Sequence, residues 1–369
     1  MMRHLSAGSD SKRNSVLRTR RDFLGEMALL IACTTGMHSR CMGRRSSAGV
    51  PPCTRGLILY PGDIMTVPEW PALAKDAGLT TLGIHSGGGG HSDYLSRCVD
   101  FVKSPAGQKF LEQCDTLGVH VEYEIHAMED LLPRDLFDKD PSMFRTDEKG
   151  QRQRKYNCCV HSENALDVIC KNTIDFARLC RPTTGRYFLW IDDGRFMCRC
   201  PKCRDYSDSE QALILENRML KALRTIEKSA SLAHLAYAKT LQPPNRITPD
   251  PGIFLEYAPI MRDYSIPYEK QGEGYKQNLT MLDANLKVFP RETAQVLEYW
   301  TDVSKFSGWK RPFKKLPWRP DVFRADVRTY KSKGIRHITA FGCGFDRYYF
   351  DRYGIPPIQE YGAGLQIIG

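Results

Sequence analysis

The chain has 369 residues, of which 41% are hydrophobic and 26% charged, a composition typical of a globular protein large enough for one extensive core. It contains no run of eighteen or more apolar residues, so it does not predict a membrane-spanning helix. The formal net charge of +10 is distributed unevenly, with +7 in residues 1–55 and +3 in the rest. Because the basic excess lies mainly at the N-terminus, we do not expect a nucleic-acid partner.

The N-terminal segment has the features of an export signal. Arg20 and Arg21 precede a short apolar stretch at 27–32, which is the twin-arginine pattern, and LIAC ends at Cys33 like a lipidation site. We therefore predict a signal over residues 1–33 and a flexible, disordered linker over 34–54. The mature protein would lie in the periplasm or at the cell surface, attached to the membrane through a lipidated Cys33. The alternative is a disordered basic N-terminus without a targeting role.

From residue 55 to residue 369, short apolar runs alternate with helical patterns, and several helical patterns end in glycine before the next run. The strand-like runs are Gly56–Tyr60, Thr80–His85, Val119–His126, Tyr187–Ile191, Ile253–Tyr257, Val296–Trp300 and Ile335–Phe341. This alternation predicts a parallel sheet. We expect an α/β fold of the (β/α)8 or TIM barrel type, with an eighth strand near Leu232–Tyr237. The alternative is an open doubly wound sheet, in which ligand groups gather at one switch point.

The barrel is favoured because polar and aromatic residues stand at the ends of nearly all the runs. Carboxylates at a partly desolvated barrel mouth usually have a partner or a task. Aromatic faces stack on sugar rings, while acids bind sugar hydroxyls. These features predict carbohydrate as the ligand, with contacts from His85, Glu124, His126, Tyr257, Tyr299, Trp300 and Asp302.

The WIDDG sequence places two adjacent carboxylates, Asp192 and Asp193, directly after the fourth run. Glycoside hydrolysis needs a general acid and a second carboxylate. One aspartate can supply the acid while its neighbour orients the substrate, and Glu298 or Glu256 can supply the second carboxylate. Alternatively, the aspartates cap the following turn or form salt bridges with Arg195 and Arg199.

The glycine run at 87–90 lacks the spacing of a nucleotide-binding loop, so we expect no organic cofactor. Three cysteines, Cys198, Cys200 and Cys203, lie within six residues and can wrap one tetrahedral metal ion. A fourth ligand could come from Cys158 or Cys159. Structural zinc is the leading interpretation, since four thiolates leave no open position for catalysis. Disulfides, which form in exported proteins, and a redox role are the alternatives.

Several motifs in order resemble an uncharacterised bacterial family, the domain of unknown function numbered 4838, which belongs among glycoside-hydrolase-like barrels. They include CCVHSENAL, WIDDGRFMCRCPKC, VLEYWTDVSKFSGW and GIRHITAFGCGFDRYYF, and the resemblance covers the chain from about Gly56 onward. It implies a barrel, favours Asp193 over Asp192 as the functional aspartate, and favours Cys159 over Cys158 as the fourth thiol ligand.

Two functions follow from the sequence. The first is an exported glycosidase with Asp193 as general acid and Asp192 as its helper. The second is a non-catalytic surface protein that binds carbohydrate through the same residues and carries a structural zinc–cysteine site. The oligomeric state cannot be read from the sequence.

Overall fold

The computed structural model describes residues 52–88, 93–271 and 273–369. The predicted export signal, the candidate lipidation site at Cys33 and nearly all of the predicted linker lie outside the described residues.

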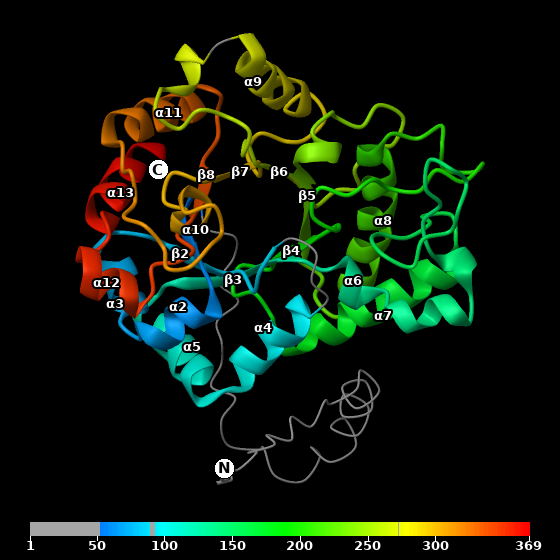
Figure 1. Ribbon diagram of the computed structural model, residues 1–369, viewed down its shortest axis with the longest axis horizontal. Coiled ribbons are helices and arrows are strands. Elements are labelled where there is room, and N and C mark those ends of the chain that lie inside the picture. Colours follow the sequence, from blue (N-terminus) through cyan, green and yellow to red (C-terminus); the bar gives the residue numbers. More distant parts are fainter. Residues whose placement is uncertain (1–51, 89–92, 272) are drawn as a thin grey trace, which may run out of the picture. The chain divides into compact units, whose positions relative to one another are not determined.

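In the described part of the chain, eight parallel strands close into a barrel in sequence order, and β1 pairs with β8. The expected (β/α)8 barrel is confirmed, and the open doubly wound alternative is wrong. The segment near Leu232–Tyr237 supplies the expected extra strand, which is β5 in chain order. Figure 1 shows the strands in the centre with helices around them. The strands are β1 (Thr54–Leu59), β2 (Thr81–Ile84), β3 (His120–His126), β4 (Arg186–Trp190), β5 (Ser231–Ala236), β6 (Ile253–Tyr257), β7 (Gln295–Glu298) and β8 (His337–Phe341).

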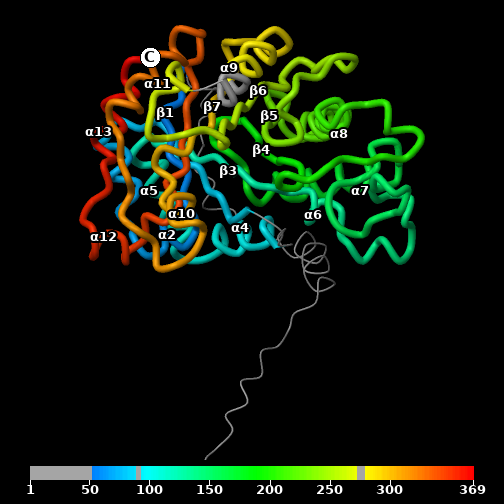
Figure 2. Tube along the Cα trace, turned by 45° about the horizontal axis from the view of Figure 1, so that its top comes forward, coloured from blue at the N-terminus to red at the C-terminus, as the bar shows by residue number. Residues whose placement is uncertain are grey.

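Helices fill the connections between the strands, as the tube in Figure 2 also shows. They are α2 (Pro61–Thr66), α3 (Trp70–Asp76), α4 (Tyr94–Lys103), α5 (Pro105–Leu117), α6 (Met128–Leu131), α7 (Glu163–Leu179), α8 (Asp208–Leu223), α9 (Glu273–Asn285), α10 (Val303–Phe306), α11 (Pro320–Ser332), α12 (Arg347–Tyr353) and α13 (Ile358–Leu365).

Local sequence sets where α5 begins and ends. The Ser104 hydroxyl accepts the N–H of Gly107, and Pro105 occupies the first helical position, where its missing N–H costs nothing. Gly118 ends the helix in the left-handed conformation at φ 66°, which a side chain would disfavour. The chain then enters β3 at His120.

Alternation along the strands decides which side chains can reach the barrel mouth. On β3, Glu122, Glu124 and His126 occupy alternate positions and therefore share one face, while the intervening residues face the other way. Their partners identify that face as the barrel interior. Thr184 donates to Glu122, and His126 packs against Trp190, the last residue of β4. The interior is thus polar below the mouth.

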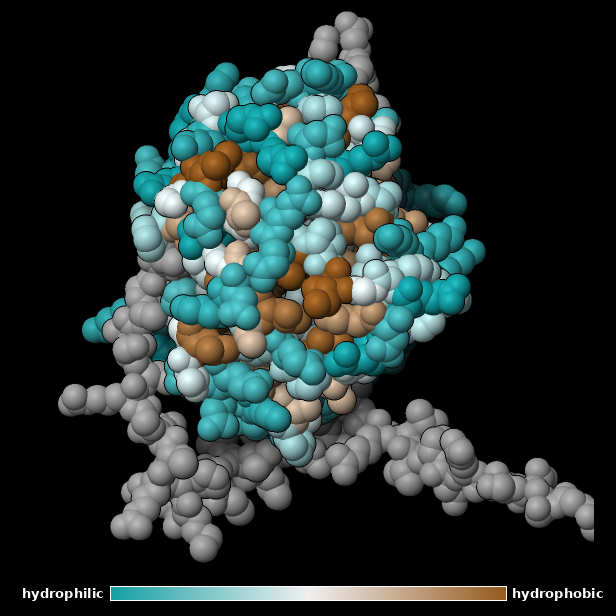
Figure 3. Space-filling model, turned by 90° about the vertical axis from the view of Figure 1, so that its left-hand side faces the viewer, coloured by the Kyte–Doolittle hydropathy of each residue, from teal (hydrophilic) through white to brown (hydrophobic). Residues whose placement is uncertain are grey.

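Apolar side chains on the face of the molecule in Figure 3 lie in separate groups among hydrophilic ones. None of the helices in the described ranges is long and apolar enough to cross a bilayer.

Candidate active site

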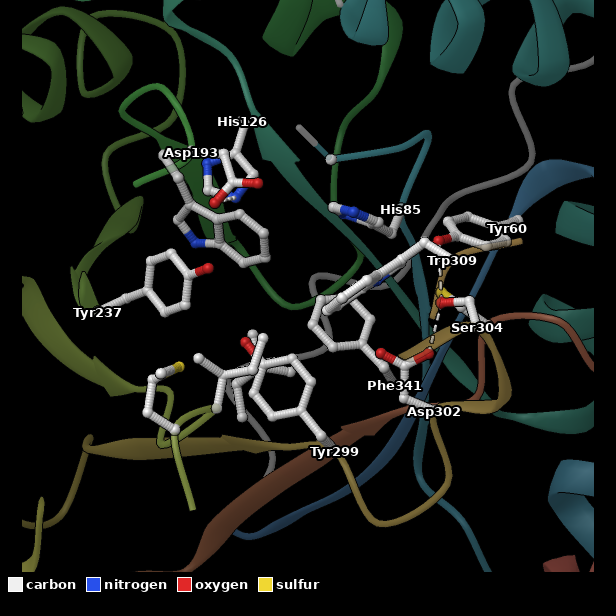
Figure 4. Close-up of a pocket in the computed structure, with 16 residues that line it drawn as sticks. Tyr60, His85, His126, Asp193, Tyr237, Tyr299, Asp302, Ser304, Trp309 and Phe341 are labelled. Carbon is white, nitrogen blue, oxygen red and sulfur yellow. Dashed lines mark hydrogen bonds and ion pairs between the residues drawn. The ribbon is translucent and has the colours of Figure 1, made fainter. Parts of the chain in front are cut away.

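A cavity of about 510 Å³ opens at the carboxyl ends of the strands (Figure 4), and we refer to it below as the mouth pocket. Every part of the barrel contributes to it, because the carboxyl ends of parallel strands meet at one rim. Its lining residues are Tyr60, His85, Gly88, His126, Trp190, Asp193, Tyr237, Ile260, Met261, Leu297, Tyr299, Asp302, Ser304, Trp309, Phe341 and Cys343.

Five of the residues expected at the site from the sequence line this pocket: His85, His126, Asp193, Tyr299 and Asp302. Six others, Glu124, Asp192, Glu256, Tyr257, Glu298 and Trp300, are not among its lining residues. Each of these six side chains is buried. Their hydrogen-bond partners are described residue by residue below.

Asp193 lies in the loop after β4 and keeps 24% of its side chain exposed. Its Oδ1 is 3.9 Å from Nε2 of His126. The hydroxyl of Tyr237 is hydrogen-bonded to Asp193, and burial together with this carboxylate raises the pKa of Tyr237. Figure 4 shows Asp193, His126 and Tyr237 grouped on one side of the pocket.

Asp302 lies in another part of the pocket in Figure 4, near Ser304 and Tyr60. Its Oδ1 accepts the Ser304 hydroxyl at 2.6 Å and the Lys305 backbone N–H at 3.0 Å. Burial raises the pKa of Asp302 to about 6, although these hydrogen bonds act to lower it. At pH 7 Asp302 is therefore mostly ionised, and a minor fraction is protonated.

The two histidines of the mouth pocket are held in the same tautomer by hydrogen bonds to backbone oxygens. Nδ1 of His85 lies 2.6 Å from the backbone oxygen of Glu124, and Nδ1 of His126 lies 2.6 Å from that of Ile191. A carbonyl oxygen only accepts, so each Nδ1 carries the hydrogen. Burial lowers the pKa of His85 to about 4, so this ring is neutral at pH 7.

Asp192 turns away from the pocket. Its Oδ2 accepts a hydrogen bond from Arg134 at 2.9 Å and another from the backbone N–H of Asn157. The Asn157 side-chain oxygen in turn accepts the N–H of Asp192 at 2.9 Å. Asp192 therefore anchors the segment that leads to the cysteine cluster. Its salt-bridge partner is Arg134, whereas the alternative considered from the sequence was a salt bridge from the aspartates to Arg195 and Arg199.

Glu256 points into the barrel below the pocket. Its Oε2 accepts the indole N–H of Trp190 at 2.7 Å, and burial raises its pKa to about 8. Glu124 is its interior neighbour, and burial followed by the charge of Glu256 raises the pKa of Glu124 well above its usual range. Burial therefore favours the protonated form of each group.

Glu298 faces the helices outside the barrel, because Leu297 next to it faces the pocket. It accepts hydrogen bonds from Tyr264, at 3.1 Å, and from Tyr330 of α11. The buried guanidinium of Arg262 lies 3.7 Å away. Glu298 therefore ties the segment after β6 to α11.

Tyr257 and Trp300 also face this outer layer. The Tyr257 hydroxyl lies 3.4 Å from that of Tyr268, and Trp300 donates its indole N–H to Asp326 at 2.9 Å. Among the lining residues that were not expected from the sequence are Trp190, Tyr237 and Ser304. Tyr237 directly follows β5, so reading the end of that strand like the others would have found it.

The four cysteines expected to bind metal lie together in the connections before and after β4. Cys159 precedes α7, and Cys198, Cys200 and Cys203 lie between β4 and α8. All four are buried, with Sγ atoms within 4.8 Å of one another, and they could hold a metal ion. Cys159 Sγ is 3.8 Å from both Cys200 Sγ and Cys203 Sγ, well beyond a disulfide bond length.

Hydrogen bonds around the cluster suit thiolates. The Cys198 sulfur accepts the backbone N–H of Thr146 at 3.2 Å and that of Cys200 at 3.4 Å. Nδ1 of His161 lies 3.2 Å from the Cys203 sulfur. Cys158 is buried but is not part of the group.

The fold is similar to those of solved β-galactosidases. A GH42 beta-galactosidase from G. stearothermophilus matches with TM-score 0.52 and 12% identity, covering 85% of this chain and 57% of that one. The enzyme from Rahnella sp. R3 matches with TM-score 0.51 and 11% identity over 86% and 56%. The enzyme from Marinomonas ef1 has TM-score 0.48 and 11% identity over 84% and 58%. The chain thus spans less than two thirds of their length, and none of the curated proteins matches it.

The protein is a (β/α)8 barrel with a polar and aromatic pocket at its mouth, and its fold is similar to that of GH42 β-galactosidases. Within that class, residues 103–340 match the family described as Domain of unknown function (DUF4838), and the chain belongs to this family.

Proposed function

We propose that the mouth pocket binds a carbohydrate and hydrolyses a glycosidic bond, with Asp193 as the general acid. The observation that carries this proposal is the joint presence of Asp193 and Asp302 in one pocket with aromatic rings. Glycosidases place the scissile bond between two carboxyl groups, and aromatic faces hold the sugar. The similarity to GH42 barrels supports the fold in which such a site is built.

Asp302 takes the role of the second carboxylate, which the sequence led us to expect from Glu298 or Glu256. Glu256 and Glu298 are completely buried and already hydrogen-bonded, so neither can reach a sugar without a rearrangement. Asp302 lines the pocket, and the hydrogen bonds from the Ser304 hydroxyl and the Lys305 N–H both reach its Oδ1. Asp192 supports Asp193 indirectly, by anchoring the preceding segment through Arg134.

Nitrophenyl glycosides of different sugars provide the test. We expect Asp193→Asn and Asp302→Asn each to reduce kcat/KM on a susceptible glycoside by at least 100-fold while both variants stay folded at the assay temperature. Asp205→Asn is the matched control, since Asp205 is exposed in the same β4–α8 connection. Full activity of Asp193→Asn would end its assignment as general acid.

The second candidate is a carbohydrate-binding protein without turnover. The hydrogen bonds of Glu256 and Glu298 favour this candidate. Glutamates at strand ends could act as catalytic carboxylates, but these two are bound to Trp190 and Tyr264 within the protein. This candidate predicts saturable glycan binding that survives Asp193→Asn with no released product. Measuring binding and product on the same glycan panel separates the two functions.

We propose zinc as the metal of the cysteine cluster, in a structural role. Thiolates at about 2.3 Å from a tetrahedral Zn²⁺ stand about 3.8 Å apart, and the two printed sulfur separations of 3.8 Å fit that geometry. One zinc per chain, with the four thiols protected from alkylation until denaturation, is the expected result. Metal-free protein with the four cysteines paired as disulfides would contradict the assignment.

Export by the twin-arginine route and lipidation of Cys33 remain proposals based on the N-terminal sequence. Fatty-acid labelling in cells should mark the wild-type chain and not Cys33→Ser. Lysine substitution of Arg20 and Arg21 should retain the protein in the cytoplasm, and unchanged export would contradict the twin-arginine route.

A further inference from the structure

The side-chain donors around the mouth pocket are almost all used within the protein. Trp190 donates to Glu256 and Cys343 to the backbone oxygen of Ile58. Ser304 donates to Asp302. Because its only hydrogen is used there, Ser304 accepts from Tyr60, whose hydroxyl oxygen lies 3.3 Å away.

Tyr237 is likewise hydrogen-bonded to Asp193, a carboxylate that can only accept when ionised. Trp309, which is 63% exposed at the pocket edge, and the hydroxyl of the lining residue Tyr299 are the further side-chain donors. A ligand inside the pocket therefore meets few side-chain donors.

Most of the side-chain groups that remain available to a ligand in the mouth pocket are hydrogen-bond acceptors. Nε2 of His85 bears the lone pair, because Nδ1 carries the hydrogen and the ring is neutral at pH 7. The Ser304 hydroxyl and the Lys305 N–H both bond to Oδ1 of Asp302, so Oδ2 keeps lone pairs for a ligand, and the oxygen of Tyr60 retains its own lone pairs. The Asp193 carboxylate adds further acceptor sites.

The charge of the lining points the same way. It contains two carboxylates, and within the described residues no lysine or arginine lines it. The nearest such cation along the chain, Lys305, lies over the rings of Tyr264 and Phe306. Arg311 is paired with Asp346. An anion entering the pocket would face the like charge of Asp302, and none of the described lysines or arginines lines the pocket to offset it.

We infer that the mouth pocket selects sugar units that donate hydrogen bonds, either neutral polyols or sugars carrying an amine, and rejects sugars carrying a carboxylate, sulfate or phosphate. The inference rests on the proposed function in taking the ligand to be a sugar. It goes beyond that function by specifying the charge class of the sugar. An ammonium group gains most, because the carboxylate of Asp302 attracts it while the acceptors bind its hydrogens.

Calorimetry at pH 7 on the full chain tests this with matched probes in the gluco and galacto series. Each series contains the methyl glycoside, the piperidine iminosugar and the uronic acid. We expect the iminosugar of one series to bind at least tenfold more tightly than the neutral glycoside, and the uronic acid at least tenfold more weakly. Asp302→Asn should reduce the iminosugar advantage at least fivefold, while Asp205→Asn should leave it unchanged.

A uronic acid that binds as tightly as the neutral sugar, or an absence of binding by every probe, overturns the inference. Failure of the proposed hydrolysis is distinguishable from either result. If the protein binds the iminosugar selectively but cleaves no glycoside, the proposed hydrolysis is wrong and the inferred charge selectivity of the pocket stands.

Discussion

The hydroxyl of Ser304 donates a 2.6 Å hydrogen bond to Oδ1 of Asp302 at the mouth of the barrel. Ser304 thereby orients the carboxylate and connects it to Tyr60, which lies 3.3 Å from the serine oxygen. The bond favours the ionised carboxylate, while burial disfavours it more strongly. Asp302 thus combines a fixed orientation with a pKa near neutrality, which suits a group that must act on a ligand.

The raised pKa of Asp302 predicts a cost in stability at neutral pH. The folded-state value of about 6 exceeds the ordinary value of 3.8, so the folded protein binds this proton more tightly than the unfolded chain. The free energy of unfolding therefore falls as pH rises through this window. We expect Asp302→Asn to unfold in urea at pH 7 with a free energy about 1–3 kcal/mol above wild type. The difference should shrink towards pH 4, and a constant difference would contradict the linkage.

The cysteine cluster should support folding through its metal. We expect Cys200→Ser to lose the bound zinc and to lower Tm by at least 5 °C, because metal binding contributes directly to folding. Cys170→Ser is the control, since Cys170 lies in α7 outside the cluster. Metal analysis and thermal unfolding on the same samples provide the check. Equal zinc content in the two variants would count against the four-thiol site.

Asp326 holds the outer layer around β7 together. It accepts hydrogen bonds from Arg262, from the backbone of Tyr268 and from Trp300. Removing this carboxylate breaks a buried ion pair and leaves Glu298, 3.7 Å away, as the remaining acidic partner of Arg262, so Asp326→Ala should cost about 3–5 kcal/mol in urea unfolding. Asp321→Ala, at an exposed position of the same helix, should change stability by less than about 1 kcal/mol. Similar values for both variants would refute the anchoring role.

Trp309 combines exposure with an unfavourable backbone conformation, since its φ is 56°. A bulky residue in the left-handed region costs about 1 kcal/mol, which favours a functional reason for its presence. We expect Trp309→Ala to weaken binding of a sugar ligand roughly tenfold through loss of stacking, while Trp309→Phe keeps most of the affinity. Tryptophan fluorescence or calorimetry measures both, and unchanged binding by the alanine variant would exclude a sugar contact.

The sequence alone determined the barrel, the position of Asp193 after the fourth strand and the three neighbouring cysteines of the cluster. The barrel follows from strand–helix alternation, which needs only local patterns of apolar residues and glycine. The cysteine cluster follows from short spacing at 198–203, because three thiols so near one another in the chain can converge without a distant contact. Cys159 came from a family resemblance, and the fold brings it to the other three.

Tertiary structure decided which strand-end residues face the pocket. Neighbouring positions on a strand point to opposite faces, so Leu297 reaches the pocket and Glu298 reaches α11. On β7, each face carries one polar and one apolar residue, Gln295 with Leu297 and Val296 with Glu298. The pattern QVLE therefore does not show which face points into the barrel. Likewise, the packing of Ser304 against Asp302 depends on the loop after β7. Strand register and loop conformation, which arise from contacts between distant segments, made that choice.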